Sequence, residues 1–186
     1  PPFKFLDILY KKEFILFIVL VSILILNSNI SPYFLDLYNL IDSTFLFSEK
    51  AIIALTMTFV IIARQIDLSV ASIIAVSSCV LGYTTSLGYD TWLVISFTLL
   101  SGALCGAFNG AIITKFAIPS IIVTIGTMSL FRGLAYSFLE DSYYNKFPKL
   151  VSNLGSGYLF GYIPYAFLTF LLLSLVFAFI LHKTSV

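Results

Sequence analysis

Charged residues are scarce in this sequence. Asp, Glu, Lys and Arg make up only 10% of its 186 residues, whereas a soluble domain carries about a quarter. The ten basic residues are scattered and form no patch, so nothing in the charge pattern indicates nucleic-acid binding. Hydrophobic residues account for 60% of the chain, and the mean hydropathy is +1.05. This balance predicts an all-α, polytopic membrane protein built as a bundle of transmembrane helices.

Residues suited to catalysis or metal binding are scarce as well. His182 is the only histidine and lies at the edge of an apolar run, and Cys79 and Cys105 both lie within apolar runs. One histidine provides neither a zinc cluster nor a Ser–His pair inside a bundle. The two cysteines are typical of free buried thiols. Neither G-x-S-x-G nor G-x-x-x-x-G-K-[ST] occurs. We therefore expect no catalytic residue, no metal ion and no cofactor.

Six apolar runs are candidates for membrane spans, since about 20 apolar residues cross the hydrocarbon core as a helix. They cover residues 13–29, 49–64, 68–87, 91–116, 119–139 and 163–181. The second run is short, which is typical of a helix broken at Arg64 and Gln65. A polar stretch precedes it over residues 36–49, and the aromatic-rich segment 140–162 is typical of a membrane surface.

The distribution of Lys and Arg predicts the orientation. With the N-terminus in the cytoplasm, the inner side carries Lys4, Lys11, Lys12, Arg64, Lys115 and Lys183, and the outer side carries Lys50, Lys146 and Lys149. Six basic residues on the inner side against three on the outer side favour a cytoplasmic N-terminus.

A polar segment, R-Q-I-D-L-S, lies between the second and third runs. Polar residues inside a membrane are costly and are candidates for function. Asp67 can cap the third helix, or it can act in coupling or in a polar path together with Ser69. Arg64 can pair with Asp67, or its long side chain can reach the inner surface.

The fourth run carries Gly102, Gly106 and Gly110 at four-residue spacing. This spacing places small residues on one helical face and predicts close helix packing. Asn109 lies beside them and needs a partner in an apolar core. It can form an interhelical hydrogen bond or line a substrate path.

The fifth run begins at Pro119, which fits the first turn of a helix. Together with Lys115 it predicts a tight turn between the fourth and fifth spans. Gly126 lies near mid-span and is a second candidate for helix packing.

Polar residues follow along the fifth run. Thr124, Thr127 and Ser129 can hydrogen-bond to the preceding helical turn, and we also consider the two threonines candidates for the substrate path. Arg132 lies near the outer interface by length. It can reach that surface or pair with Glu140 or Asp141, and it is otherwise a candidate for the path.

Three segments carry a resemblance to a known family. They are I-D-L-S-V (66–70), G-A-L-C-G-A-F-N-G (102–110) and I-P-S-I-I-V-T-I-G-T-M-S-L-F-R-G (118–133). The sequence resembles the ribose-type ABC importer permeases of bacteria. The commoner members carry Gly-Gly where this chain has Arg64 and Gln65, so this position is more similar to the rhamnose and autoinducer-2 branches.

The resemblance implies a fold of about ten helices, similar to the vitamin B12 importer permease, with the N-terminus inside. Residues 1–186 are then expected to form one incomplete permease domain that lacks the C-terminal helices and the segment that contacts the ATPase. The implied function is that of a permease subunit in the bacterial inner membrane, importing a monosaccharide or a similar small polar molecule.

The resemblance also implies partners. These are cytoplasmic ABC ATPase subunits, a periplasmic sugar-binding protein, and a second permease that is either identical or related, all in or at the lipid bilayer. ATP hydrolysis would belong to the ATPase, so the chain itself is not expected to be an enzyme. An ion-gradient-driven secondary transporter is the alternative, because broken helices suit that class too. A third possibility, an intramembrane enzyme, is disfavoured by the missing catalytic residues.

Overall fold

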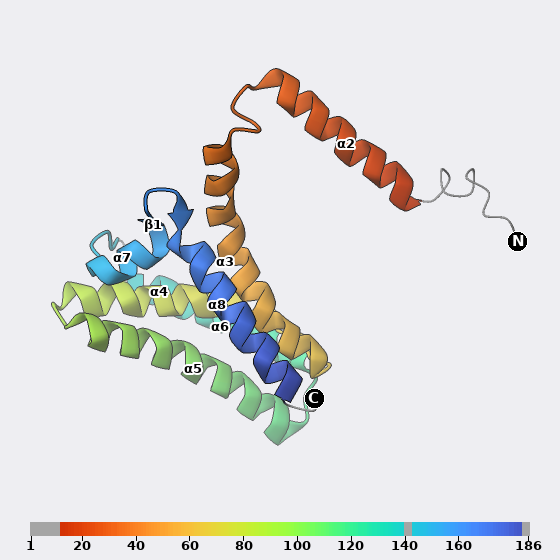
Figure 1. Cartoon of the computed structure of the whole chain (residues 1–186). Coiled ribbons are helices and arrows are strands. Elements are labelled where there is room, and N and C mark those ends of the chain that lie inside the picture. The colour runs from red at the N-terminus through yellow and green to blue at the C-terminus, as the bar shows by residue number, and fades with distance from the viewer. Residues whose placement is uncertain (1–11, 140–142, 184–186) are drawn as a thin grey trace, which may run out of the picture.

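The computed structural model describes residues 12–139 and 143–183 and confirms the all-α class (Figure 1). The elements are α2 (Lys12–Ile30), α3 (Leu37–Ile62), α4 (Val70–Ser86), α5 (Thr91–Phe116), α6 (Ser120–Leu139), α7 (Lys149–Ser156), β1 (Tyr158–Leu159), β2 (Ile163–Pro164) and α8 (Tyr165–Lys183). The two strands form only a short antiparallel hairpin. Five helices, α2, α3, α5, α6 and α8, are long and apolar enough to cross a membrane, and α4 is a shorter apolar helix.

The predicted spans match these helices closely, with one correction. The second span does not start near residue 49, because α3 already begins at Leu37 and runs for 26 residues. At 1.5 Å per residue it is about 39 Å long, which exceeds the roughly 30 Å hydrocarbon core. Asp42 and Glu49 lie in its first half, and α3 is nevertheless long and apolar enough as a whole to cross a membrane. Lys50, assigned from sequence to an outer loop, therefore lies within α3.

The aromatic-rich segment after α6 contains regular structure. Within its described part, residues 143–162, it forms α7 and the first strand of the hairpin. The ring of Tyr144 lies so close to Gly82 of α4 that a Cβ at residue 82 would come within 2.5 Å of it.

The helices pack as two units, and α2 lies apart from both with no buried residue (Figure 1). In the first unit, α4 packs against α5 and α6. Its apolar core is Val76 and Cys79 from α4 with Phe131 and Ala135 from α6. Cys79 and Cys105 are both free thiols, as predicted, but only Cys79 is buried, and Cys105 is half-buried.

In the second unit, α3 packs against α8, with α7 and the hairpin at one end. Ring contacts join the two long helices. Phe47 meets Phe170 with ring centroids 6.1 Å apart, and Phe59 meets Phe177 at 4.8 Å, both edge to face. The ends of α3, α5 and α8 lie at the same end of the molecule (Figure 1).

The predicted tight turn between α5 and α6 is present. Ala117 ends α5 in the left-handed conformation, with φ of 52°, which is a common way to terminate a helix. Pro119 directly precedes the first residue of α6, and its carbonyl accepts the Ile122 N–H at 3.0 Å. This turn brings the start of α6 next to the segment that joins α3 to α4.

Candidate functional site

The helix break predicted at Arg64 and Gln65 is present. Helix α3 ends at Ile62, Arg64 has a left-handed φ of 57°, and α4 begins only at Val70. We call residues 63–69 the helix break. Backbone groups outside a helix need other partners in a membrane-spanning bundle, because lipid provides none.

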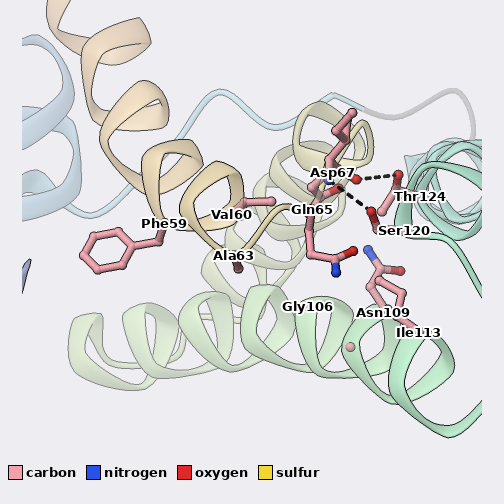
Figure 2. A pocket seen from close by; sticks show the side chains of 12 residues that line it. Phe59, Val60, Ala63, Gln65, Asp67, Gly106, Asn109, Ile113, Ser120 and Thr124 are labelled. Atoms are coloured by element: carbon pink, nitrogen blue, oxygen red, sulfur yellow. Dashed lines mark hydrogen bonds between the residues drawn. The ribbon is translucent and has the colours of Figure 1, made fainter. Parts of the chain in front are cut away.

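Two hydroxyl groups of α6 hold the main chain of Ile66. The Ile66 N–H donates to Ser120 Oγ at 3.0 Å, and Thr124 Oγ1 donates to the Ile66 carbonyl at 3.3 Å (Figure 2). Both side chains are buried, Thr124 at 1% exposure. Sequence reasoning singled out Thr124 but missed Ser120. A hydroxyl residue directly after Pro119, at the start of an apolar helix, was the available signal.

A chain of side-chain hydrogen bonds then joins the helix break to α5. The Asn109 Nδ2 group donates to Ser69 Oγ at 2.8 Å, and Ser69 Oγ donates to Asp67 Oδ1 at 2.7 Å. The same Asp67 oxygen accepts the Ser69 N–H at 2.8 Å. The interhelical bond considered for Asn109 is therefore formed. Asp67 is not the N-cap of α4, as considered from sequence, because that position belongs to Ser69. Its carboxylate instead orients the N-cap residue.

Asn109 is only 4% exposed, yet half of its amide has no partner. Its Oδ1 atom is buried without a hydrogen bond to any described residue, and the Ser72 Oγ atom is in the same situation. Buried polar atoms without partners are uncommon and costly. Of the two residues, only Asn109 lines a pocket.

The pocket lies between the helix break, α3, α5 and α6 and has a volume of about 330 Å³ (Figure 2). Its polar lining comes from Gln65, Asp67, Asn109, Ser120 and Thr124. Apolar walls come from Phe59, Val60, Ala63 and Ile113. Sequence reasoning did not single out Gln65, whose side chain extends into this space (Figure 2).

The three glycines of α5 have different surroundings. A Cβ at Gly102 would come within 3.2 Å of Ser77 Oγ, so α4 does approach closely there. A Cβ at Gly106 or Gly110 would meet nothing within 4 Å, and both glycines line the pocket. The close packing predicted for all three is therefore formed only at Gly102. Gly126 of α6 likewise has no close neighbour.

The remaining candidates lie outside the pocket lining. Arg64 and Arg132 are exposed, and the described residues form no salt bridge, so Arg64 does not pair with Asp67. Glu140 and Asp141, the partners considered for Arg132, lie outside the described residues. Thr127 is buried and donates to the Thr124 carbonyl at 3.4 Å, and Ser129 donates to Ile125 at 3.5 Å, so both bond to the preceding turn as considered.

The site is rich in hydrogen-bonding side chains. It combines one carboxylate with amides and hydroxyls, and among residues 12–139 and 143–183 no three His, Cys, Asp or Glu side chains gather to hold a metal ion. Such groups bind an uncharged polar solute through hydrogen bonds, with apolar walls against its carbon atoms.

Comparison with known proteins gives a family and several relatives. Residues 39–186 match the family model described as "Branched-chain amino acid transport system / permease component". The chain is 39% identical over 121 residues to the autoinducer 2 import system permease protein LsrD of Klebsiella pneumoniae, covering 65% of this chain and 36% of that protein. It is 33% identical over 155 residues to the ribose import permease protein RbsC of Haemophilus influenzae, covering 81% and 47%.

A third relative, the autoinducer 2 import system permease protein LsrC of Yersinia pestis, is 33% identical over 151 residues, covering 80% of this chain and 43% of that protein. The chain thus spans less than half the length of these three relatives. No solved structure matches it significantly, so the expected likeness to the vitamin B12 importer permease stays a prediction.

Proposed function

Because the chain belongs to the family of branched-chain amino acid transport system permease components, we propose that it is part of the membrane-spanning permease subunit of an ATP-driven importer. It is a multi-pass membrane protein, with five helices long and apolar enough to span. Its proposed role is to provide a path across the bacterial inner membrane, while a separate subunit hydrolyses ATP.

The observation that carries this proposal is the helix break and its pocket. A spanning helix stops at Ile62, and the following residues are held by polar side chains from two other helices. Irregular backbone inside a membrane is tolerated where it is buried in protein or lines a water-filled cavity. Helix breaks of this kind form substrate sites in other transporters.

The proposed cargo is a monosaccharide or a similar small polar molecule. The family description names branched-chain amino acids, but the names of the three relatives specify autoinducer 2 and ribose. The lining of the pocket favours an uncharged solute over an amino acid, because it has one carboxylate and no described cationic side chain to bind a carboxylate group.

The proposed partners are cytoplasmic ABC ATPase subunits, a periplasmic sugar-binding protein and a second permease. The proposed orientation has the N-terminus in the cytoplasm, which places the helix break and the turn at Ala117–Pro119 on the inner side. Lys50 now lies inside α3, which leaves Lys146 and Lys149 as the outer cations. The inner side therefore still carries more Lys and Arg than the outer side.

Uptake measurements on the full-length gene with its neighbouring genes test the proposal. We expect import of a labelled monosaccharide to stop when ATP is depleted and to persist when the ion gradients are collapsed. Import that instead follows the ion gradient would support the alternative of a secondary transporter and contradict the proposal.

A pair of aspartates tests whether the helix break matters for transport. Asp67 and Asp90 each accept the backbone N–H of the residue two positions later, at 2.8 Å and 3.0 Å. Only Asp67 lines the pocket. We expect Asp67→Ala to reduce uptake strongly and Asp90→Ala to leave it close to wild type, at matched protein levels. Equal uptake by the two variants would mean that Asp67 serves only local structure.

A further inference from the structure

We propose that the pocket at the helix break is a binding site for an uncharged, polyhydroxylated solute, in which Asp67 Oδ2 accepts hydrogen bonds from its hydroxyl groups and the Gln65 amide both donates and accepts. The proposal rests on the proposed function and extends it, because it gives the permease a binding site for its cargo along the path.

Asn109 supports the polar side of the pocket. Its Nδ2 group donates to Ser69, which fixes the orientation of the amide. Its Oδ1 atom is buried with no partner among the described residues, so it is not accessible to a solute. Because Ser69 in turn donates to Asp67 Oδ1, Asn109 holds the Asp67 carboxylate in place at the pocket.

The side chains beside Asn109 have free hydrogen-bonding capacity. Asp67 uses one carboxylate oxygen, Oδ1, for both bonds from Ser69, and its Oδ2 atom has no hydrogen-bond partner among the described residues. The Gln65 side chain likewise forms no hydrogen bond with them and extends into the pocket (Figure 2). The Ser120 hydroxyl accepts the Ile66 N–H but donates to none of the described residues. The pocket therefore presents both acceptors and donors, which matches a solute whose hydroxyl groups can do both.

The pocket also has the size and shape of a small-molecule site. A volume of about 330 Å³ falls in the range of small-molecule pockets, about 300–1,000 Å³. A bound cation needs several oxygens converging on one point, at about 2.3–2.6 Å for calcium, and would leave most of this space unfilled. The apolar walls from Phe59, Val60 and Ile113 suit the C–H faces of a compact polyol.

The space itself depends on glycine. Because a Cβ at Gly106 would meet nothing within 4 Å, a larger side chain there projects into the pocket without displacing protein atoms near its Cβ. Gly126 has the same freedom on α6 but does not line the pocket. The two positions form a matched pair in which one substitution fills the site and the other does not.

Binding of D-ribose to the purified full-length permease in lipid nanodiscs, measured by titration calorimetry, tests the proposal. Fully O-methylated D-ribose is the comparison, since it keeps the ring but has no hydroxyl donor. We expect the wild type to bind D-ribose and not the methylated sugar. We expect Gly106→Leu to abolish this binding and Gly126→Leu to keep it. Gln65→Leu should weaken it by about two- to tenfold, as expected for one net hydrogen bond.

Several outcomes would overturn the proposal. They are absence of D-ribose binding to the wild type, equal binding of the methylated sugar, or equal affinity of Gly106→Leu and Gly126→Leu. Thermal unfolding checks that each variant is folded. If Gly106→Leu does not fold, unchanged affinity of Gln65→Leu overturns the proposal instead. Uptake by cells separates this result from the proposed function: import without binding refutes only the site, whereas binding without import refutes only the transport role.

Discussion

The α4–α6 unit and the α3–α8 pair are built from similarly apolar helices but are held together differently. In the first unit, buried hydroxyl and amide groups join α5 and α6 to the helix break that precedes α4 through directed hydrogen bonds. In the second, the long helices meet mainly through edge-to-face phenylalanine rings. Its inter-element polar bond runs from Tyr158 of the hairpin to Asp42 near the start of α3.

The first unit therefore fixes the positions of its polar side chains, whereas the second mainly holds its two long helices together. Hydrogen bonds are directional, so Ser69 and Ser120 fix where Ile66 and Asp67 lie. Ring contacts tolerate small shifts, because they depend on area and approximate angle. The pocket lies where the two units meet, with a positioned polar side from α5, α6 and the helix break and an apolar side from α3. We therefore expect the free energy of unfolding to fall when a polar group is removed from the first unit and when an aromatic ring is removed from the second.

The largest expected effect is that of Ser69→Ala. It removes the acceptor of the Asn109 amide and the hydroxyl donor to Asp67, and a buried group left without a partner costs about 1–3 kcal/mol. We expect the free energy of unfolding in detergent micelles to fall by this amount. Ser72→Ala is the control, one turn along the same helix, because the Ser72 hydroxyl is buried with no partner to lose. A similar loss in both variants would contradict the role given to the Ser69 network.

A smaller effect is expected in the second unit from Phe177→Leu. The substitution keeps an apolar side chain but removes the edge-to-face contact with Phe59, which is worth about 0.5–1.5 kcal/mol. The same unfolding measurement checks it. Phe179→Leu on the same helix is the control, because Phe179 is 64% exposed and forms no ring contact among the described residues. If Phe177→Leu lowered the free energy of unfolding as much as Ser69→Ala does, the proposed difference between the hydrogen-bonded unit and the ring-packed unit would be contradicted.

The smallest effect at neutral pH is expected from Tyr158→Phe, and it should depend on pH. The hydrogen bond from the Tyr158 hydroxyl to Asp42 raises the pKa of this tyrosine above its ordinary value, and partial burial and the Asp42 charge act in the same direction. A raised pKa in the folded state means that the fold favours the protonated hydroxyl. The stabilisation is therefore complete below about pH 10, the ordinary tyrosine pKa, and is lost as the pH rises further.

Thermal unfolding of the wild type and the Tyr158→Phe variant, measured from neutral to alkaline pH, checks this expectation. The difference in midpoint between them should shrink above about pH 10. Tyr162→Phe is the control, since Tyr162 is exposed and its hydroxyl has no partner among the described residues. A difference that stays constant with pH would show that the Tyr158 hydroxyl does not act through Asp42.

Several individual features were predictable from local patterns. The limits of α5 follow from Asp90 at its start and from the turn before Pro119 at its end. The break after Ile62 follows from polar residues between two apolar runs. The early start of α3 was not predictable from hydropathy, because Asp42 and Glu49 resemble loop residues until their place on a long helix is known.

The sequence by itself determined the class of this protein, the number of its apolar helices and their approximate limits apart from the start of α3, the position of the helix break and the resemblance to a permease family. These properties follow from composition and short-range order along the chain. Only the tertiary structure decided that Ser69 rather than Asp67 occupies the N-cap position of α4, that Ser120 holds Ile66, and that Gly106 opens onto a pocket while Gly102 packs. The physical reason is that hydrogen bonds and cavities depend on which side chains from distant segments meet, and the local pattern of one helix does not contain that information.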